Sequence, residues 1–198
     1  MRQVLVFLFC LVALGCGHPD YNANVYKNQP DPRGKELVLG VGDVLAINVW
    51  DQKDLNTEAT IRPDGTITMP LIGDLKASGD TPTALRDKIK AQLTNFVKIG
   101  GGNEITVAVK SWKSYRFTVQ GEVVKPGLFT NDEYVTVADA LALAGGPTRF
   151  ADRAAILLMR KQESGKTISI PLNFDLLASG KRPDMNIWVL PGDVIYVP

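Results

Sequence analysis

The chain has 198 residues, with 22 basic and 21 acidic side chains and a net charge of +1. This near balance lacks the clustered positive charge that nucleic-acid binding requires. The length allows one large domain or two small ones. One histidine and two cysteines provide too few ligands for a typical metal cluster, so we expect no metal and no cofactor.

The N-terminal segment has the pattern of a secretory signal peptide. A basic residue precedes an apolar run that ends at Leu14, and a small glycine and Cys16 follow. The apolar run is shorter than the roughly 20 residues that a membrane span needs. We predict a signal peptide over residues 1–15 and lipid attachment at Cys16. The alternative is an ordinary signal peptide with a chance cysteine, because Ala13 stands where lipoprotein signals usually carry leucine.

Residues 16–36 are predicted to form a lipidated, flexible tether. The stretch contains three prolines and many Asn, Asp and Gly residues, and it shows no hydrophobic period. His18 lies in this stretch, where no fixed geometry would hold it as the base of a catalytic triad. Cys10 would leave with the signal peptide, so Cys16 would have no intramolecular disulfide partner.

Residues 37–112 are predicted to form the first folded unit. Partial alternation of β-branched residues indicates a strand over 44–50, and the Pro-Asp-Gly turn at 63–65 indicates a hairpin over 61–69. A further alternating strand is predicted over 105–112.

A helix is predicted to begin at Pro82, with Thr81 as its N-cap. Its apolar face is formed by residues at helical spacing, namely Leu85, Ile89, Leu93 and Phe96. The three glycines at 100–102 are expected to end it.

Residues 113–198 are predicted to form a second unit. Strands are expected over 116–124, 187–190 and 194–197, and a hairpin over 155–171. Thr136 and Asp139 fit a capping box for a helix that extends to residue 144. The apolar face of that helix comprises Val137, Ala140, Leu141 and Ala144. A short helical turn is expected around residues 174–177.

A Gly-Asp pair occurs near each end of the folded region. Asp43 and Asp193 each follow a glycine and precede a β-rich run. Aspartate after glycine can cap the turn that launches a strand. We interpret both residues as turn formers rather than catalytic groups.

Catalytic and nucleotide-binding motifs are poorly matched. Asp51, Asp54 and Glu58 could in principle supply the carboxylate pair of a glycosidase, but they fall in a polar loop that favours solvated charges. The Gly-Lys-Thr at 165–167 lacks the earlier glycine of a phosphate-binding loop, because Arg160 occupies that position. We therefore predict that the protein is not an enzyme.

The remaining pattern resembles a known pair of domains. In the first unit, LGVGDVL at 39–45, RPDGTI at 62–67 and PLIGDL at 70–75 resemble the polysaccharide biosynthesis/export domain. In the second unit, VQGEV at 119–123 and AGGPT at 144–148 are similar to a soluble-ligand-binding β-grasp (SLBB) domain. The resemblance implies an α+β fold with these two domains in order.

This resemblance implies the outer-membrane polysaccharide export (OPX, Wza-like) family. Family members form rings that pass capsule or exopolysaccharide across the outer membrane, with an inner-membrane co-polymerase and tyrosine kinase as partner. Longer members add a C-terminal membrane helix, which we expect this chain to lack after Pro198. We therefore expect a passive homo-oligomeric ring on the periplasmic face, anchored by lipid at Cys16, beneath a separate outer-membrane β-barrel pore protein.

Two alternatives and one interface prediction remain open. The chain could instead be a monomeric periplasmic module that binds a glycan or a small ligand, or a glycan hydrolase using Asp51 or Asp54. Ring contacts are expected to involve aromatic residues, because Tyr and Trp are enriched at protein interfaces. The candidates for exposed aromatics are Trp112, Tyr115, Tyr134 and Trp188, of which at least half are expected to be buried in the core.

Overall fold

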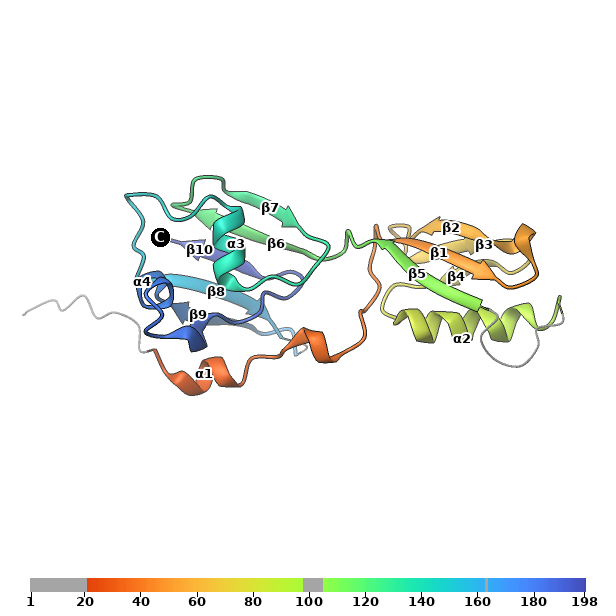
Figure 1. The fold of residues 1–198 in the computed structure, drawn as a ribbon, viewed down its shortest axis with the longest axis horizontal. Coiled ribbons are helices and arrows are strands. Elements are labelled where there is room, and N and C mark those ends of the chain that lie inside the picture. The colour runs from red at the N-terminus through yellow and green to blue at the C-terminus, as the bar shows by residue number, and fades with distance from the viewer. Residues whose placement is uncertain (1–20, 98–104, 163) are drawn as a thin grey trace, which may run out of the picture.

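The computed structural model describes residues 21–97, 105–162 and 164–198. Two lobes lie end to end in an elongated molecule, joined where β5 leads into β6 (Figure 1). Each lobe combines strands with helix and has its own buried apolar cluster. The predicted α+β class is confirmed.

The first lobe is built on a three-stranded antiparallel sheet in the order β2-β1-β5. These strands are β1 (Val44–Val49), β2 (Thr57–Thr60) and β5 (Ile105–Ser111). Alternation along β1 buries Leu45, Ile47 and Val49 on one face of the sheet. A 3-10 turn, η2 (Lys53–Leu55), leads into β2. The predicted strands at 44–50 and 105–112 are thus confirmed.

Helix α2 (Pro82–Leu93) packs against β5. Thr81 caps it through a hydrogen bond from the Ala84 N–H, as predicted, and Leu85, Ile89 and Leu93 are fully buried. Phe96 was wrongly placed on this apolar face, because it follows the end of the helix and is exposed. The glycines predicted to end the helix, at 100–102, lie outside the described residues.

The turn at 63–65 forms as predicted, but its strand pairing differs. The Asp64 carboxylate accepts a hydrogen bond from the Thr66 N–H, and Gly65 has a φ of 78°. The strand after the turn, β3 (Thr66–Met69), then pairs with β4 (Gly73–Lys76) in a separate two-stranded sheet. The hairpin therefore lies one element later in the chain than the turn chemistry suggested.

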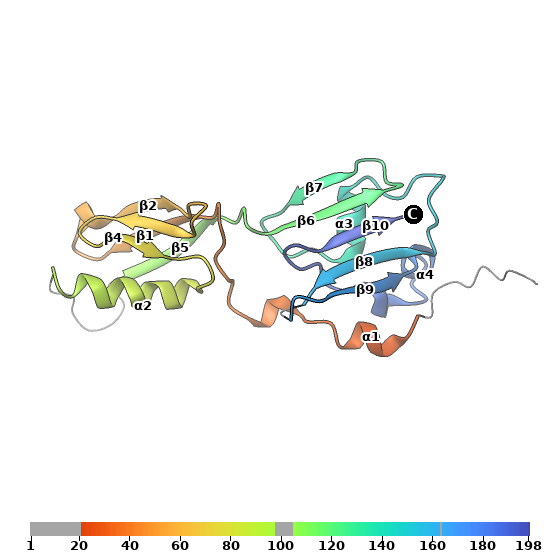
Figure 2. The ribbon, with the colours of Figure 1, turned by 180° about the vertical axis from the view of Figure 1, so that it is seen from behind.

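The second lobe contains a five-stranded sheet in the order β7-β6-β10-β8-β9. Its strands are β6 (Arg116–Gly121), β7 (Gly127–Thr130), β8 (Ile156–Lys161), β9 (Thr167–Leu172) and β10 (Val194–Val197). The last strand, β10, runs parallel to β6, whereas the other neighbours are antiparallel. Figure 2 shows this order, with α3 behind the sheet.

Most local predictions for the second lobe hold, although β6 ends at Gly121 rather than at residue 124 and β7 was not predicted. Helix α3 (Val137–Leu143) begins with the capping box of Thr136 and Asp139, and α4 (Phe174–Ala178) follows β9. The β8–β9 hairpin is also confirmed. The strand predicted over 187–190 is wrong, because Trp188 makes only an isolated bridge with Thr136.

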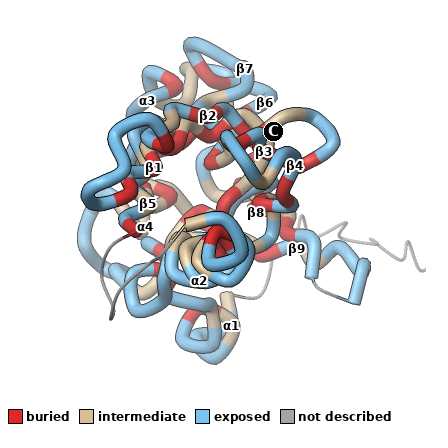
Figure 3. The backbone as a smooth tube through the Cα atoms, turned by 90° about the vertical axis from the view of Figure 1, so that its right-hand side faces the viewer, coloured by how far each residue is buried: buried red, intermediate tan, exposed pale blue. Residues whose placement is uncertain are grey.

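Residues 21–36 differ from the flexible tether that we expected. Helix α1 (Ala23–Lys27) and the 3-10 turn η1 (Pro32–Gly34) form here, while η3 (Pro183–Met185) lies beside α1. Tyr26 is only 3% exposed, and its hydroxyl donates to the Pro171 carbonyl at 2.6 Å. The segment is held because this aromatic side chain enters the core of the second lobe. Figure 3 shows α1 near the outside of the molecule. It also shows that the loops of both lobes consist mostly of exposed residues.

Candidate functional site

The three-stranded sheet of the first lobe has one open face. The face opposite its core carries residues that are exposed or half-buried, namely Ala46 and Asn48 on β1, Glu58 on β2, and Thr106, Ala108 and Lys110 on β5. Glu58 and Lys110 form an ion pair across it. The apolar residues on this face are Val44 and two small alanines, and the alanines are paired in register across β1 and β5.

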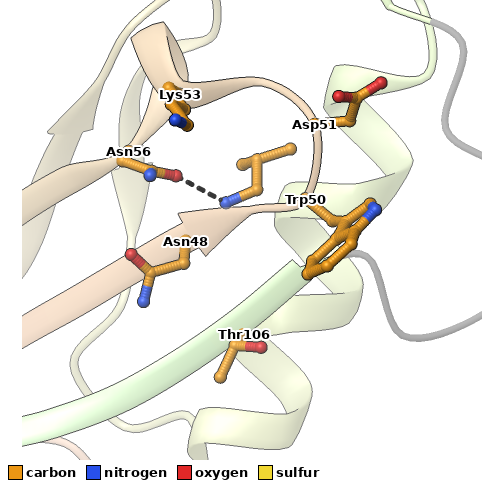
Figure 4. A pocket seen from close by; sticks show the side chains of 7 residues that line it. Asn48, Trp50, Asp51, Lys53, Asn56 and Thr106 are labelled. Carbon is orange, nitrogen blue, oxygen red and sulfur yellow. Dashed lines mark hydrogen bonds between the residues drawn. The ribbon is translucent and has the colours of Figure 1, made fainter.

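A hollow of about 660 Å³ lies where β1 ends. Figure 4 shows its lining, which comprises Asn48, Val49, Trp50, Asp51, Lys53, Asn56 and Thr106. The residues come from β1, from β5 and from the turn that leads into β2. The hollow therefore combines one large aromatic ring with amide, hydroxyl and charged groups.

Register and hydrogen bonding position the polar part of this lining. Asn48 on β1 stands directly opposite Thr106 on β5. On the other side of β1, next to β2, the Asn56 Oδ1 accepts a hydrogen bond from the Val49 N–H at 2.8 Å. Of the two polar atoms of the Asn56 side-chain amide, only the oxygen can accept from a backbone N–H, so this bond also decides which way the amide is turned.

Two further features distinguish the end of β1. Trp50 is 79% exposed, although tryptophan is usually largely buried. Asp51 follows it with a φ of 59°, in the left-handed region that non-glycine residues seldom occupy. Such backbone conformations persist where the surrounding structure holds them, and they cluster at ligand sites.

The structure does not support the three candidate carboxylates as a catalytic pair. Asp51 lines the hollow, Asp54 lies in the exposed turn η2, and Glu58 is paired with Lys110. All three are exposed, as predicted, but Glu58 lies on strand β2 rather than in a loop. Sequence reasoning missed Trp50, Asn48 and Asn56. The available signal was the polar residue at 48 and the tryptophan at 50 on one side of an otherwise apolar strand.

The four aromatic residues proposed for subunit contacts are not exposed. Trp112 and Tyr115 are buried and stack with ring centroids 4.7 Å apart, and Tyr134 packs edge-on against both. Burial raises the pKa of Tyr115, whose hydroxyl donates to the Val189 carbonyl at 3.0 Å. Trp188 is half-buried beneath the Arg33 guanidinium, 4.3 Å from the ring centroid.

Both Gly-Asp pairs form turns, as predicted, and both aspartates are buried. Asp43 accepts hydrogen bonds from the Gly40 N–H at 2.8 Å and from the Ser114 N–H at 2.7 Å. Asp193 accepts from the Leu190 N–H at 2.7 Å and forms an ion pair with buried Arg160 at 2.5 Å. These bonds account for both carboxylates structurally.

A contrasting charged cluster lies on the β3–β4 hairpin. The Arg62 guanidinium donates to Asp74 at 2.7 Å, and Thr68 donates to the same carboxylate at 2.6 Å. These hydrogen bonds, with that of Arg62 the stronger influence, lower the pKa of Asp74 below its usual value.

Cys16 and His18 lie outside the residues that the structure describes. Among residues 21–97, 105–162 and 164–198, no group of three or more His, Cys, Asp or Glu side chains is arranged to hold a metal ion. No helix in those same ranges is long and apolar enough to span a membrane.

Comparison with known proteins matches both lobes. Residues 31–110 match the family described as polysaccharide biosynthesis/export protein, and residues 116–171 match the SLBB domain. The EPS I polysaccharide export outer membrane protein EpsA of Ralstonia nicotianae is 31% identical over 186 residues, covering 80% of this chain and 46% of the relative.

Two more relatives have similar names. The capsule polysaccharide export protein BexD of Haemophilus influenzae is 28% identical over 79% of this chain and 42% of its own length. The capsule polysaccharide export outer membrane protein CtrA of Neisseria meningitidis is 26% identical over 79% of this chain and 43% of its own length. The chain thus spans less than half the length of these relatives.

The family and these relatives are described by export rather than by catalysis, which confirms the prediction that the protein is not an enzyme. The two domain matches follow one another along the chain in the predicted order. The chain thus contains a polysaccharide biosynthesis/export domain followed by an SLBB domain, the pair that the Wza-like resemblance predicted.

Proposed function

We propose that the protein is a ring-forming component of a complex that exports exopolysaccharide or capsule across the outer membrane. The observation that carries this proposal is the ordered pair of domains over residues 31–171, together with relatives named for polysaccharide export. The ring lies on the periplasmic face of the outer membrane and acts as a passive conduit. An inner-membrane co-polymerase and tyrosine kinase delivers the polymer, and a separate outer-membrane pore protein completes the path.

Deletion of the gene tests the export role. We expect the deletion strain to lose surface polysaccharide while its polymer-synthesising enzymes remain active, measured by polymer staining of intact cells and by synthesis in membrane extracts. A plasmid copy of the gene should restore the surface polymer. Normal surface polymer in the deletion strain would contradict the proposal.

Membrane attachment is proposed to depend on lipid at Cys16. A Cys16→Ser variant should lose metabolic labelling with a fatty acid and should leave the outer-membrane fraction. A Cys10→Ser variant is the matched control, because Cys10 belongs to the predicted signal peptide. Undiminished labelling of Cys16→Ser would exclude this site.

The ring itself is tested by native mass spectrometry of the purified protein. Cyclic assemblies use head-to-tail contacts between different surfaces of neighbouring subunits, so a single closed oligomer is expected. A stable monomer that binds oligosaccharide would instead support the alternative of a glycan-binding module.

A further inference from the structure

We infer that the hollow at the end of β1 is a saccharide-binding subsite, in which Trp50 stacks on a sugar ring and the polar residues around it bind the hydroxyl groups (Figure 4). This inference rests on the proposed export function and deepens it by naming where the polymer touches the chain. The ligand is one pyranose unit of a polysaccharide.

The exposure of Trp50 is the first argument. The chain has three tryptophans, and the other two are covered by buried aromatics or by Arg33. Trp50 alone presents its ring to solvent, at 79% exposure. An aromatic face carries a negative quadrupole, which attracts the weakly positive C–H groups on one side of a pyranose ring. A rigid indole at the rim of a hollow therefore suits a sugar.

The polar row beside the tryptophan is the second argument. Asn56 ends the η2 turn, Asn48 lies on β1 and Thr106 lies on β5, and all three line the hollow. Amide and hydroxyl groups can both donate and accept, as sugar hydroxyls do. The Asn56 Oδ1 is held by the Val49 N–H, and no hydrogen bond joins its Nδ2 to another described residue. That nitrogen can therefore donate to a ligand.

The charge of the hollow favours an uncharged sugar unit. Asp51 and Lys53 both line it, so their charges balance. The left-handed backbone at Asp51 directs the chain around the rim in a conformation that a non-glycine residue adopts at a cost. Beyond the hollow, the open face continues past the in-register pair Ala46 and Ala108 to the ion pair of Glu58 and Lys110.

A protein partner fits this surface less well. Interface centres are typically apolar and depleted of charged residues. Every side chain that lines the hollow is polar or charged, apart from Trp50 and buried Val49. The second lobe exposes four large apolar side chains, namely Val124, Leu128, Leu143 and Phe150, whose chemistry is closer to that of an interface centre.

The test uses oligosaccharides released by mild acid from the surface polysaccharide of the producing cells. Binding to the purified protein is measured by calorimetry and by iodide quenching of tryptophan fluorescence. We expect the oligosaccharides to protect Trp50 from iodide. Trp50→Ala should weaken binding about ten-fold, and Trp50→Phe, which keeps an aromatic face, should weaken it only about three-fold. Asn48→Ala should weaken it about three-fold through the loss of one hydrogen bond.

Phe150→Ala is the matched control. Phe150 is an aromatic residue of similar exposure, at 72%, on the other lobe, and its removal should leave oligosaccharide affinity unchanged. Unaltered affinity in Trp50→Ala, or no binding by the native protein, would overturn the subsite. A change in oligomer mass without a change in affinity would assign Trp50 to a subunit contact and also overturn it. Failure of the export function is detected separately, as normal surface polymer in the deletion strain.

Discussion

The two Gly-Asp turns share their geometry but serve different parts of the molecule. Gly42 and Gly192 have φ values of 93° and 85°, and each following aspartate accepts a hydrogen bond from the N–H three residues before it. Asp43 then binds Ser114, in the connection between the lobes, whereas Asp193 binds a buried arginine.

This difference shows how one local turn acquires two structural roles. At the first turn, Gly40 packs so closely that an added Cβ would lie 2.3 Å from the Ser114 Cβ. The turn thereby holds together the points where the chain enters and leaves the first lobe. At the second turn, Arg160 also binds the Trp188 carbonyl and Gln29, so the turn anchors three segments of one core.

The largest effect is expected from Asp193→Ala. Arg160 is 5% exposed, and removing its carboxylate leaves a buried charge without an anionic partner. We expect a loss of about 4 kcal/mol in the free energy of unfolding of the second lobe. Chemical denaturation, with peptide-level hydrogen exchange of β8 and β10, measures it.

A double variant provides the control for this prediction. Asp193→Ala combined with Arg160→Met removes both charges and keeps an apolar side chain of similar length, so most of the lost stability should return. A double variant as unstable as Asp193→Ala would show that the turn, rather than the buried charge, is responsible.

Asp43→Ala is expected to have the next largest effect. It removes the acceptor of two backbone N–H groups, at Gly40 and Ser114, at a cost of about 3 kcal/mol. Hydrogen exchange should rise in the first lobe and around residue 114, with β8 unchanged. Asp43→Asn keeps one acceptor oxygen and should cost about half as much. Loss of protection in β8 would contradict the separation of the two turns.

Gln29→Ala tests the link between residues 21–36 and the second turn. It removes the acceptor for the Arg160 Nη1, at 2.9 Å, and should reduce stability by about 1 kcal/mol. Limited proteolysis within residues 21–36 should become faster. Asn28→Ala, an adjacent change, is the control. Equal cleavage rates in Gln29→Ala and the native protein would show that the hydrogen bond between Gln29 and Arg160 does not hold the segment.

Arg62→Gln contrasts an exposed ion pair with the buried one and should have the smallest effect. Because Arg62 lowers the pKa of Asp74, this carboxylate stabilises the fold above its unfolded pKa, and the contribution is lost as pH falls through the lower folded pKa. In Arg62→Gln the pKa of Asp74 should rise toward its ordinary value, measured by NMR titration. Stability at neutral pH should change little. An unchanged Asp74 titration would contradict this assignment.

Much of the local structure could be predicted because its causes lie within a few residues. The capping box at Thr136, the cap at Thr81 and the turn at Gly65 each depend on side chains close to the backbone groups they bind. Phe96 and the strand predicted at 187–190 failed for a related reason. Apolar spacing predicts buried positions only where the backbone stays helical or extended. Helix α2 ends before Phe96, and residues 187–190 do not form a strand.

The candidate site was harder to predict from the sequence than the local structure. Trp50 directly follows the alternating strand β1, yet nothing in that pattern says that its side of the sheet stays open. Trp112 and Tyr115 occur in a similar alternating context and are buried in the core. Whether a side chain is exposed depends on which other segments pack over it, and those segments are distant in the chain.

By itself, the sequence determined the α+β class, the order of the two domains, most helix and strand positions and the turn-forming role of both aspartates. These depend on periodicity, capping and turn chemistry, which act over short range. Only the tertiary structure decided that β3 pairs with β4, that residues 21–36 pack on the second lobe, and that Trp50 stands open beside a polar row. The physical reason is that burial and pairing depend on contacts between segments far apart in the chain, and local propensity does not select among those partners.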